Sequence, residues 1–273
     1  MSLVTSEWLN KNLSKVKIID ASWHMPSSNR NAYNEYKKEH IKNAIFFDLD
    51  KSSNQNTELP HMLNDINSWE SIVAEMGISN KDEIVIYDNS DLISSCRCWY
   101  NFIYFGHDLK KIHVLNGGLK NWIITKKLTT NKINKINKAN YKAKELKHLV
   151  KNKNQINENI YNFKFEVLDA RSRKRFKGIE PEPRAKLRSG SIKNSKCLPF
   201  SECINKIDHT FKKKKEIKIL FNTILNNINQ KNVIFTCGSG VTAAVLAFAY
   251  SLINKDYLPI IYDGSWSEYG RNN

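Results

Sequence analysis

Residues 233–249 read Val-Ile-Phe-Thr-Cys-Gly-Ser-Gly-Val-Thr-Ala-Ala-Val-Leu-Ala-Phe-Ala. The apolar, β-branched run that starts at Val233 predicts a buried strand, and the Ala-rich run after Gly240 predicts a helix. Cys237 therefore falls at a strand-to-helix turn, where backbone N–H groups and the positive end of the helix favour the thiolate form of cysteine. The alternative is an inert buried cysteine, but such a residue does not require the glycines at 238 and 240 that free the backbone around it.

The chain has 273 residues, of which 41% are hydrophobic, so it is long enough for one large or two ordinary domains. No apolar run approaches the ~18 residues needed to cross a bilayer, and the first residues lack the basic start and apolar stretch of a signal peptide. The five cysteines form an odd, sparse set, which argues for a reducing compartment and against a disulfide framework. We therefore expect a cytoplasmic protein without a membrane partner.

The formal net charge is +16, from 43 Lys and Arg against 27 Asp and Glu. Most of the excess is lysine spread along the chain, and only residues 212–215 form a dense basic run. Aromatic residues do not alternate with the basic ones, as a stacking platform for single-stranded nucleic acid requires. The charge thus favours a lysine-rich solvated surface over a nucleic-acid partner, and its positive field would attract a small anion.

The two halves of the chain repeat one pattern with an offset of about 150 residues. Segments 17–22, 40–46, 83–88 and 114–119 match segments 166–171, 191–197, 232–237 and 261–266 in kind. Each half thus offers about four short apolar strands, separated by amphipathic stretches such as 67–77. This alternation predicts an α/β fold in which each half forms a parallel sheet with helices on both faces.

The repeat also predicts the domain boundaries and the side of the molecule that carries chemistry. We expect an N-terminal domain at 1–125, a linker at the Lys/Asn-rich segment 126–150 and a C-terminal domain at 151–273. Ligands of open α/β sheets bind beyond the carboxyl ends of the strands, where the second copy has Cys237 and the first has Asp88. Because aspartate cannot replace a sulfur nucleophile, we expect the first domain to be catalytically inactive. The site would belong to the second domain or to the cleft between the domains.

A set of short motifs extends along nearly the whole chain. They are Asp20-Ala-Ser-Trp23, Phe46-Phe-Asp-Leu-Asp50, Asn116-Gly-Gly-Leu119, Asp169-Ala-Arg171, Arg175-Phe-Lys-Gly-Ile-Glu-Pro-Glu-Pro-Arg184, Cys237-Gly-Ser-Gly-Val-Thr-Ala243 and Tyr262-Asp-Gly-Ser-Trp-Ser-Glu-Tyr-Gly270. With these motifs the chain resembles the two-domain rhodanese-like sulfurtransferases, which implies tandem rhodanese-like domains and a persulfide on Cys237. Family members that use thiosulfate have basic residues directly after this cysteine. Members that use 3-mercaptopyruvate have Gly-Ser there, as this chain has at 238–239.

The resemblance also implies substrate-binding residues. Arg175 and Arg184 would hold the carboxylate and carbonyl of the substrate, and guanidinium groups suit that task because they bind carboxylates in bidentate fashion. The backbone N–H groups from Gly238 to Thr242, including those of Gly240 and Val241, would line the substrate site and stabilise the persulfide.

A Ser–His–Asp relay is implied by the resemblance to some members, and it would map onto Ser239, His61 and Asp50. His61 and Asp50 would then come from the first domain. The alternative for His61 is a solvated side chain in a Pro-containing loop. The sequence departs from the family at 39–43 and 190–194, where the Pro-Gly turn of a Gly-His-Ile-Pro-Gly segment is absent, and we expect these changes to affect turns.

The activity implied is sulfur transfer from 3-mercaptopyruvate through a Cys237 persulfide to a thiol acceptor, with release of pyruvate. Thioredoxin, a small thiol or cyanide would take the sulfur, and no metal or organic cofactor is implied. The nearest alternative is a thiosulfate:cyanide sulfurtransferase, which the absence of basic residues at 238 and 239 disfavours. A non-catalytic sulfur-carrier or interaction module is disfavoured by Cys237, and a cysteine phosphatase by Ala243, where that class needs an arginine.

Overall fold

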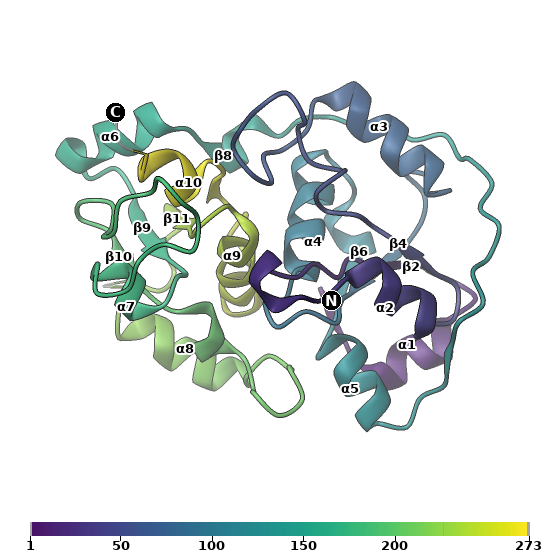
Figure 1. The fold of residues 1–273 in the computed structure, drawn as a ribbon. Coiled ribbons are helices and arrows are strands. Elements are labelled where there is room, and N and C mark those ends of the chain that lie inside the picture. The colour runs from purple at the N-terminus through teal and green to yellow at the C-terminus, as the bar shows by residue number, and fades with distance from the viewer. Residues whose placement is uncertain (1, 226, 272–273) are drawn as a thin grey trace. The chain divides into compact units, whose positions relative to one another are not determined.

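The computed structural model describes residues 2–225 and 227–271, which form two compact units. The first unit contains the described residues of 1–55, 63–146 and 206–210. The second contains those of 56–62, 147–205 and 211–273. Each unit is built on a five-stranded sheet of its own (Figure 1).

The sheet of the first unit has the strand order β1-β6-β5-β2-β4, and all neighbouring strands in it are parallel. Strands β3 and β7 form a separate antiparallel pair. The strands are β1 (Leu3–Val4), β2 (Lys17–Asp20), β3 (His40–Ile41), β4 (Ala44–Phe46), β5 (Ile84–Tyr87), β6 (Ile112–Leu115) and β7 (Thr129–Thr130). The helices are α1 (Ser6–Asn12), α2 (Ala32–Lys38), α3 (Ile66–Glu75), α4 (Ser95–Tyr104) and α5 (Gly118–Ile124), with short 3₁₀ turns at Pro26–Ser28 and Leu109–Lys111.

The central strands of the first unit are buried, apart from the half-buried Lys17 at the start of β2. Ile18 of β2 and Val85 of β5 pack with Trp122 of α5 in a core that also includes side chains of α1 and α2. Helix α4 lies against β5 and β6, and Phe102 of α4 meets Trp69 of α3 edge-on with ring centroids 5.1 Å apart. Burial on both faces is the reason why these strands are continuous apolar runs in the sequence.

The second sheet has the order β10-β9-β11-β12-β8, and its neighbouring strands are also all parallel. The strands are β8 (Val150–Lys151), β9 (Glu166–Asp169), β10 (Lys196–Cys197), β11 (Val233–Thr236) and β12 (Ile261–Tyr262). The helices are α6 (Lys153–Asn162), α7 (Arg173–Phe176), α8 (Lys214–Asn222), α9 (Val241–Ile253) and α10 (Ser265–Tyr269), with 3₁₀ turns at Lys147–Leu149 and Phe200–Cys203.

Helix α9 packs along β11 and is buried over most of its length (Figure 1). Phe235 of β11 meets Tyr250 of α9, with ring centroids 5.9 Å apart, while the neighbouring Ile234 packs with Ile156 of α6 and Trp266 of α10. The helix has 13 residues, and nowhere in the described ranges is a helix long and apolar enough to cross a membrane. The apolar run after the cysteine is therefore a core helix that anchors the loop before it.

The predicted α/β architecture with two repeated parallel sheets is confirmed. Strands β2, β4, β5 and β6 hold the same places in the first sheet as β9, β10, β11 and β12 in the second. Each sheet has five strands instead of the four expected. The additional strands, β1 and β8, are two-residue edge strands, which are too short to show an apolar pattern.

The segment predicted as a linker makes many backbone hydrogen bonds with the first unit. Strand β7 pairs with β3, the N–H of Ala139 donates to the carbonyl of Ala74 at 2.9 Å, and that of Leu146 donates to Tyr104 at 2.8 Å. Val150 instead begins a strand of the second sheet. Backbone hydrogen bonds of this kind produce no apolar periodicity, so the sequence does not indicate them. The domain boundaries at 125 and 150 stay a prediction.

Candidate active site

The cysteine loop follows β11 directly, as the strand-to-helix pattern predicts. Cys237 and Ser239 are buried, with 2% and 5% of their surfaces exposed. Gly240 precedes α9 with φ of 80°, a left-handed conformation in which a side chain would be strained. Val241 and Thr242 lie in the first turn of α9. The backbone N–H groups of this turn have no acceptor within the helix, and the cysteine loop leads directly into it.

The segment 265–267 holds the backbone of the cysteine loop in place. The carbonyl of Cys237 accepts the N–H of Trp266 at 2.9 Å, and the carbonyl of Gly238 accepts both the N–H and the hydroxyl of Ser267, at 2.9 and 2.6 Å. The hydroxyl of Ser265 accepts the N–H of Cys237 at 3.3 Å. In a trans peptide the N–H points opposite to the carbonyl, so the N–H groups of Gly238 and Ser239 point away from this segment. The carbonyl dipoles are thereby fixed on one side of the loop.

The two predicted substrate arginines converge on the residue after the cysteine. A Cβ atom added to Gly238 would lie 3.3 Å from Nη2 of Arg175 and 3.4 Å from Nη1 of Arg184. Arg184 also donates from Nη2 to the hydroxyl of Ser239 at 3.2 Å. The missing side chain at Gly238 thus leaves the space that both guanidinium groups border.

A buried carboxylate orients Arg175. Glu182, whose side chain is 1% exposed, accepts from Nε and Nη2 of Arg175 at 3.2 and 2.5 Å and from Nη1 of Arg171 at 2.7 Å. Arg171 in turn donates to Asp169 at the end of β9 and lies over the ring of Trp266. Burial by itself would lower the pKa of the Arg171 guanidinium. The carboxylates of Asp169 and Glu182 together have the larger effect and raise this pKa. The result is a rigid ion-pair chain that ends on Arg175.

His61 joins the same site. Its Nδ1 lies 2.9 Å from the hydroxyl of Ser239, and its side chain is buried. The segment 56–62 belongs to the second compact unit, where Glu58 also pairs with Arg271 at 3.2 Å. His61 thus lies within the predicted first domain, 1–125, by sequence, but the contacts of its loop place it in the second compact unit. The solvated alternative for His61 does not hold.

Asp50 belongs to the first compact unit. Both of its carboxylate oxygens accept the indole N–H of Trp23, each at 3.0 Å. Its part in a relay with Ser239 and His61 stays a prediction.

Comparison with known proteins gives the family of this fold and site. The model of the rhodanese-like domain matches residues 5–125 and again residues 142–272. The chain belongs to the rhodanese-like sulfurtransferases, of the type that uses 3-mercaptopyruvate or thiosulfate.

Relatives of this rhodanese-like chain carry both substrate names. It is 37% identical to thiosulfate/3-mercaptopyruvate sulfurtransferase 1, mitochondrial, of Arabidopsis thaliana, over 98% of this chain and 75% of the relative. It is 33% identical to the 3-mercaptopyruvate sulfurtransferase of Homo sapiens (98% and 91% covered) and to the thiosulfate sulfurtransferase of Rattus norvegicus (99% and 92%). Among solved structures, SseA from Escherichia coli, described as a 3-mercaptopyruvate sulfotransferase, aligns with a TM-score of 0.85 and 27% identity over 98% of this chain and all of that one.

The first rhodanese-like unit has Asp88 where the second has Cys237. Asp88 follows β5, the counterpart of β11, and its carboxylate accepts the N–H groups of Ser90 and Ser95, both at 2.9 Å. Burial raises the pKa of this carboxyl. The residue that replaces the cysteine therefore closes its own loop by hydrogen bonds.

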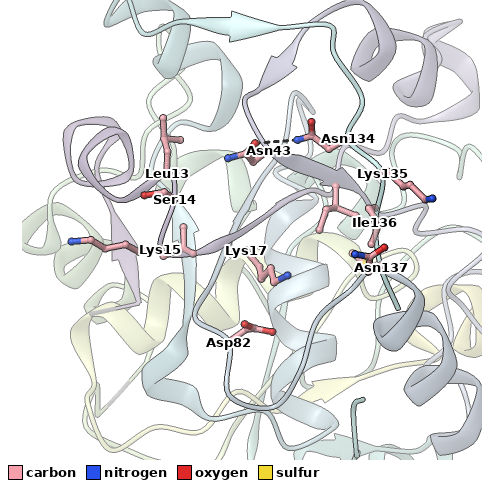
Figure 2. A pocket seen from close by; sticks show the side chains of 13 residues that line it. Leu13, Ser14, Lys15, Lys17, Asn43, Asp82, Asn134, Lys135, Ile136 and Asn137 are labelled. Carbon is pink, nitrogen blue, oxygen red and sulfur yellow. Dashed lines mark hydrogen bonds between the residues drawn. The ribbon is translucent and has the colours of Figure 1, made fainter. Parts of the chain in front are cut away.

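A large cavity of the first rhodanese-like unit lies away from the strand ends that carry chemistry. It has a volume of about 470 Å³ and is lined at the amino ends of β2 and β4 by residues such as Lys17 and Asn43. Figure 2 shows these side chains, and Asn134, which also lines the cavity, donates to Asn43 at 3.0 Å. Asp82, the acid of this cavity, accepts the N–H of Ser79 at 2.6 Å and so caps a turn. Because α/β ligands bind at the carboxyl ends of the strands, we assign this cavity no part in sulfur transfer.

Sequence reasoning missed three residues that hold the rhodanese-like site together. Glu182, Ser265 and Ser267 each lie inside a motif that carries the resemblance, but no role was assigned to them. An acid placed between two prolines and two residues before Arg184 was the available signal for Glu182. Ser265 and Ser267 gave no such signal. Their hydrogen bonds to the cysteine loop arise only because β12 pairs with β11 and places the two serines beside that loop.

Proposed function

We propose that the chain transfers sulfur from 3-mercaptopyruvate to a thiol acceptor through a persulfide on Cys237. The observation that carries this proposal is the convergence of Arg175 and Arg184 beside Gly238, one residue from the nucleophile. Two guanidinium groups at this place suit an anionic 2-oxo acid whose sulfur must reach the cysteine.

The other cysteines are poor candidates for the nucleophile. Burial raises the pKa of Cys197 to about 11 and that of Cys203 to about 12. Burial also raises the pKa of the Cys96 and Cys98 thiols. A thiol with a raised pKa is protonated at neutral pH and reacts slowly, which supports Cys237.

The choice of 3-mercaptopyruvate over thiosulfate rests on position 238. A side chain there would approach both arginines to 3.3–3.4 Å at its first carbon. A basic side chain, of the kind that thiosulfate-using members have after the cysteine, would add like charge to this crowding. A basic residue at 238 would therefore require both guanidinium groups to move, whereas glycine accommodates the converging arginine pair as it stands. Thiosulfate transfer remains the second candidate, because relatives of both kinds are about equally similar.

In the first half-reaction, the Cys237 thiolate attacks the substrate sulfur. A sulfur–sulfur bond forms, the carbon–sulfur bond breaks, and its electron pair moves into the enolate of pyruvate. The proton of the substrate thiol ends on the methyl carbon of pyruvate, so atoms and charge balance. The N–H groups of Gly238, Ser239 and the start of α9 stabilise the persulfide anion.

Ser239 and His61 are proposed to move this proton. The Ser239 hydroxyl accepts from Arg184, which is always a donor, and its own proton is then available to Nδ1 of His61 at 2.9 Å. Asp50 is retained as a predicted third member. In the second half-reaction, a thiolate attacks the outer sulfur, and Cys237 leaves as a thiolate; thioredoxin, a small thiol or cyanide would serve. We also retain the proposals of a cytoplasmic location and an inactive first domain.

The decisive experiment is intact mass spectrometry after brief treatment with 3-mercaptopyruvate. We expect the wild type to gain one sulfur and release pyruvate, and Cys237→Ser to do neither. Cys197→Ser is the matched control, since it removes a cysteine of the same unit and should still gain the sulfur. A sulfur adduct on Cys237→Ser would overturn the assignment of the nucleophile.

The donor is tested by comparing kcat/KM for 3-mercaptopyruvate and thiosulfate. We expect the wild type to prefer 3-mercaptopyruvate, and Gly238→Arg to reduce that preference because it displaces the two arginines. A wild-type preference for thiosulfate would refute the donor and leave the persulfide chemistry intact.

A further inference from the structure

A pocket of the second unit, which carries Cys237, opens beside the cysteine loop. Its volume is about 310 Å³, near the low end of the roughly 300–1,000 Å³ typical of small-ligand sites. Arg184 and Ser267 are part of its wall, and both touch the loop, through Ser239 and the carbonyl of Gly238 respectively. A ligand in this pocket is thus next to the residues that flank the nucleophile.

The pocket is predominantly cationic. Arg184, Lys186 and Arg271 line it, against a single carboxylate, Glu58. The side chain of Glu58 is 89% exposed, and it pairs with Arg271 at 3.2 Å. Exposed ion pairs contribute little free energy, so the carboxylate of a ligand can take the place of Glu58 on Arg271 at small cost.

The walls of the pocket are tied together before any ligand arrives. Leu187 and Arg271 form a backbone bridge, and the N–H of Arg188 donates to the carbonyl of Gly270 at 2.9 Å. The guanidinium of Arg271 also donates from Nε to the carbonyl of Ser267 at 3.2 Å. Arg271 is therefore anchored to Ser267, which also binds the carbonyl of Gly238 in the cysteine loop.

We propose that this pocket binds the acidic group of a small acceptor thiol, with Lys186 and Arg271 as its anion-binding residues. The inference rests on the proposed persulfide mechanism and adds the class of acceptor. Pyruvate leaves before the acceptor reacts, so Arg184 can take part in both half-reactions. The bound thiolate attacks the outer sulfur of the persulfide, the sulfur–sulfur bond breaks, and the Cys237 thiolate leaves.

The test compares acceptors that differ in charge. The enzyme is loaded with persulfide, either from 3-mercaptopyruvate or from inorganic polysulfide, and mixed with 3-mercaptopropionate (anionic), 2-mercaptoethanol (neutral) or reduced thioredoxin. We measure kcat/KM for each acceptor in the wild type, Arg271→Gln and Lys186→Gln. The matched control is Lys193→Gln, which removes one exposed positive charge outside the pocket lining.

We expect Arg271→Gln to lower the anionic-to-neutral ratio of kcat/KM about tenfold, the effect of losing one hydrogen bond to a charged group. Lys186→Gln should lower the ratio to a lesser extent, and Lys193→Gln should leave it unchanged. The ratio cancels any general effect on the persulfide or on folding. An unchanged ratio in both pocket variants would overturn the proposal. A fall in kcat/KM of the pocket variants for reduced thioredoxin alone would also overturn it, because the pocket would then be part of a protein-docking surface. Failure to load from 3-mercaptopyruvate with normal loading from polysulfide would refute the donor alone.

Discussion

The carboxylate of Glu182 is expected to control the orientation of Arg175, and Glu182→Gln tests this directly. The glutamine keeps the size of the side chain and one carbonyl oxygen, but it removes the negative charge between Arg171 and Arg175. It also turns an amide N–H₂ group toward a guanidinium, where a donor meets a donor.

The magnitude follows from the burial of the three groups. Removing one partner of a buried ion pair costs about 3–5 kcal/mol. Here Arg171 keeps Asp169, and the side chain of Arg175 is 22% exposed, so we expect a smaller loss, about 2–3 kcal/mol of unfolding free energy. For catalysis, Arg175 loses at least one charge-assisted hydrogen bond worth roughly 1.5–3 kcal/mol, which corresponds to a fall of about 10- to 100-fold in kcat/KM for 3-mercaptopyruvate.

The assay is steady-state release of pyruvate, together with urea unfolding of each variant. Glu180→Gln is the matched control, because Glu180 is two residues away and 44% exposed, and its partners are Lys174 at 3.6 Å and the hydroxyl of Ser172 at 3.3 Å. It should change unfolding by less than about 0.5 kcal/mol. If Glu182 acts through Arg175, adding Glu182→Gln to Arg175→Ala should cause no further loss of kcat/KM. A wild-type kcat/KM in Glu182→Gln, or additive losses in the double variant, would refute the reasoning.

Three further changes test the fold around the sites. Ser267→Ala removes the 2.6 Å hydroxyl bond to the Gly238 carbonyl, so persulfide formation in stopped flow should slow about tenfold, and an unchanged rate would contradict the clamp. Burial raises the pKa of Asp20 from 3.8 to about 6, so the folded protein keeps a proton that the unfolded chain releases, and stability falls as pH rises from about 4 to 6. Asp20→Asn should not show this loss of unfolding free energy, which amounts to at most about 3 kcal/mol. Urea unfolding at pH 4 and 7 measures it, and an equal change with pH in the wild type and the variant would contradict the prediction. Gly118→Ala places a Cβ 2.2 Å from the carbonyl oxygen of Asp88 at φ of 53°, so its thermal unfolding midpoint should drop by several degrees, whereas an unchanged midpoint would show that the first unit relaxes easily.

The strand–loop–helix unit around Cys237 could be predicted because each of its parts is local. A β-branched run, two glycines and an Ala-rich run are adjacent in the chain, and their conformational preferences agree. The repeat of the two halves was visible for the same reason, since central strands buried on both faces must be apolar. The two-residue strands β1 and β8 were missed because the hydrogen bonds of a neighbour, and not a pattern of their own, make them strands.

The sequence by itself predicted the cysteine loop and the arginine pair and determined the parallel architecture, because each depends on residues close together in the chain or on a repeated pattern. Only the tertiary structure decided that Arg175 and Arg184 meet at Gly238, that Glu182 aligns one of them, and that His61 contacts Ser239 across 178 positions of the chain. The physical reason is that hydrogen bonds and ion pairs act over about 3 Å in space. Which side chains come that close depends on how the strands order themselves in the sheet, and that order is set by packing of the whole unit.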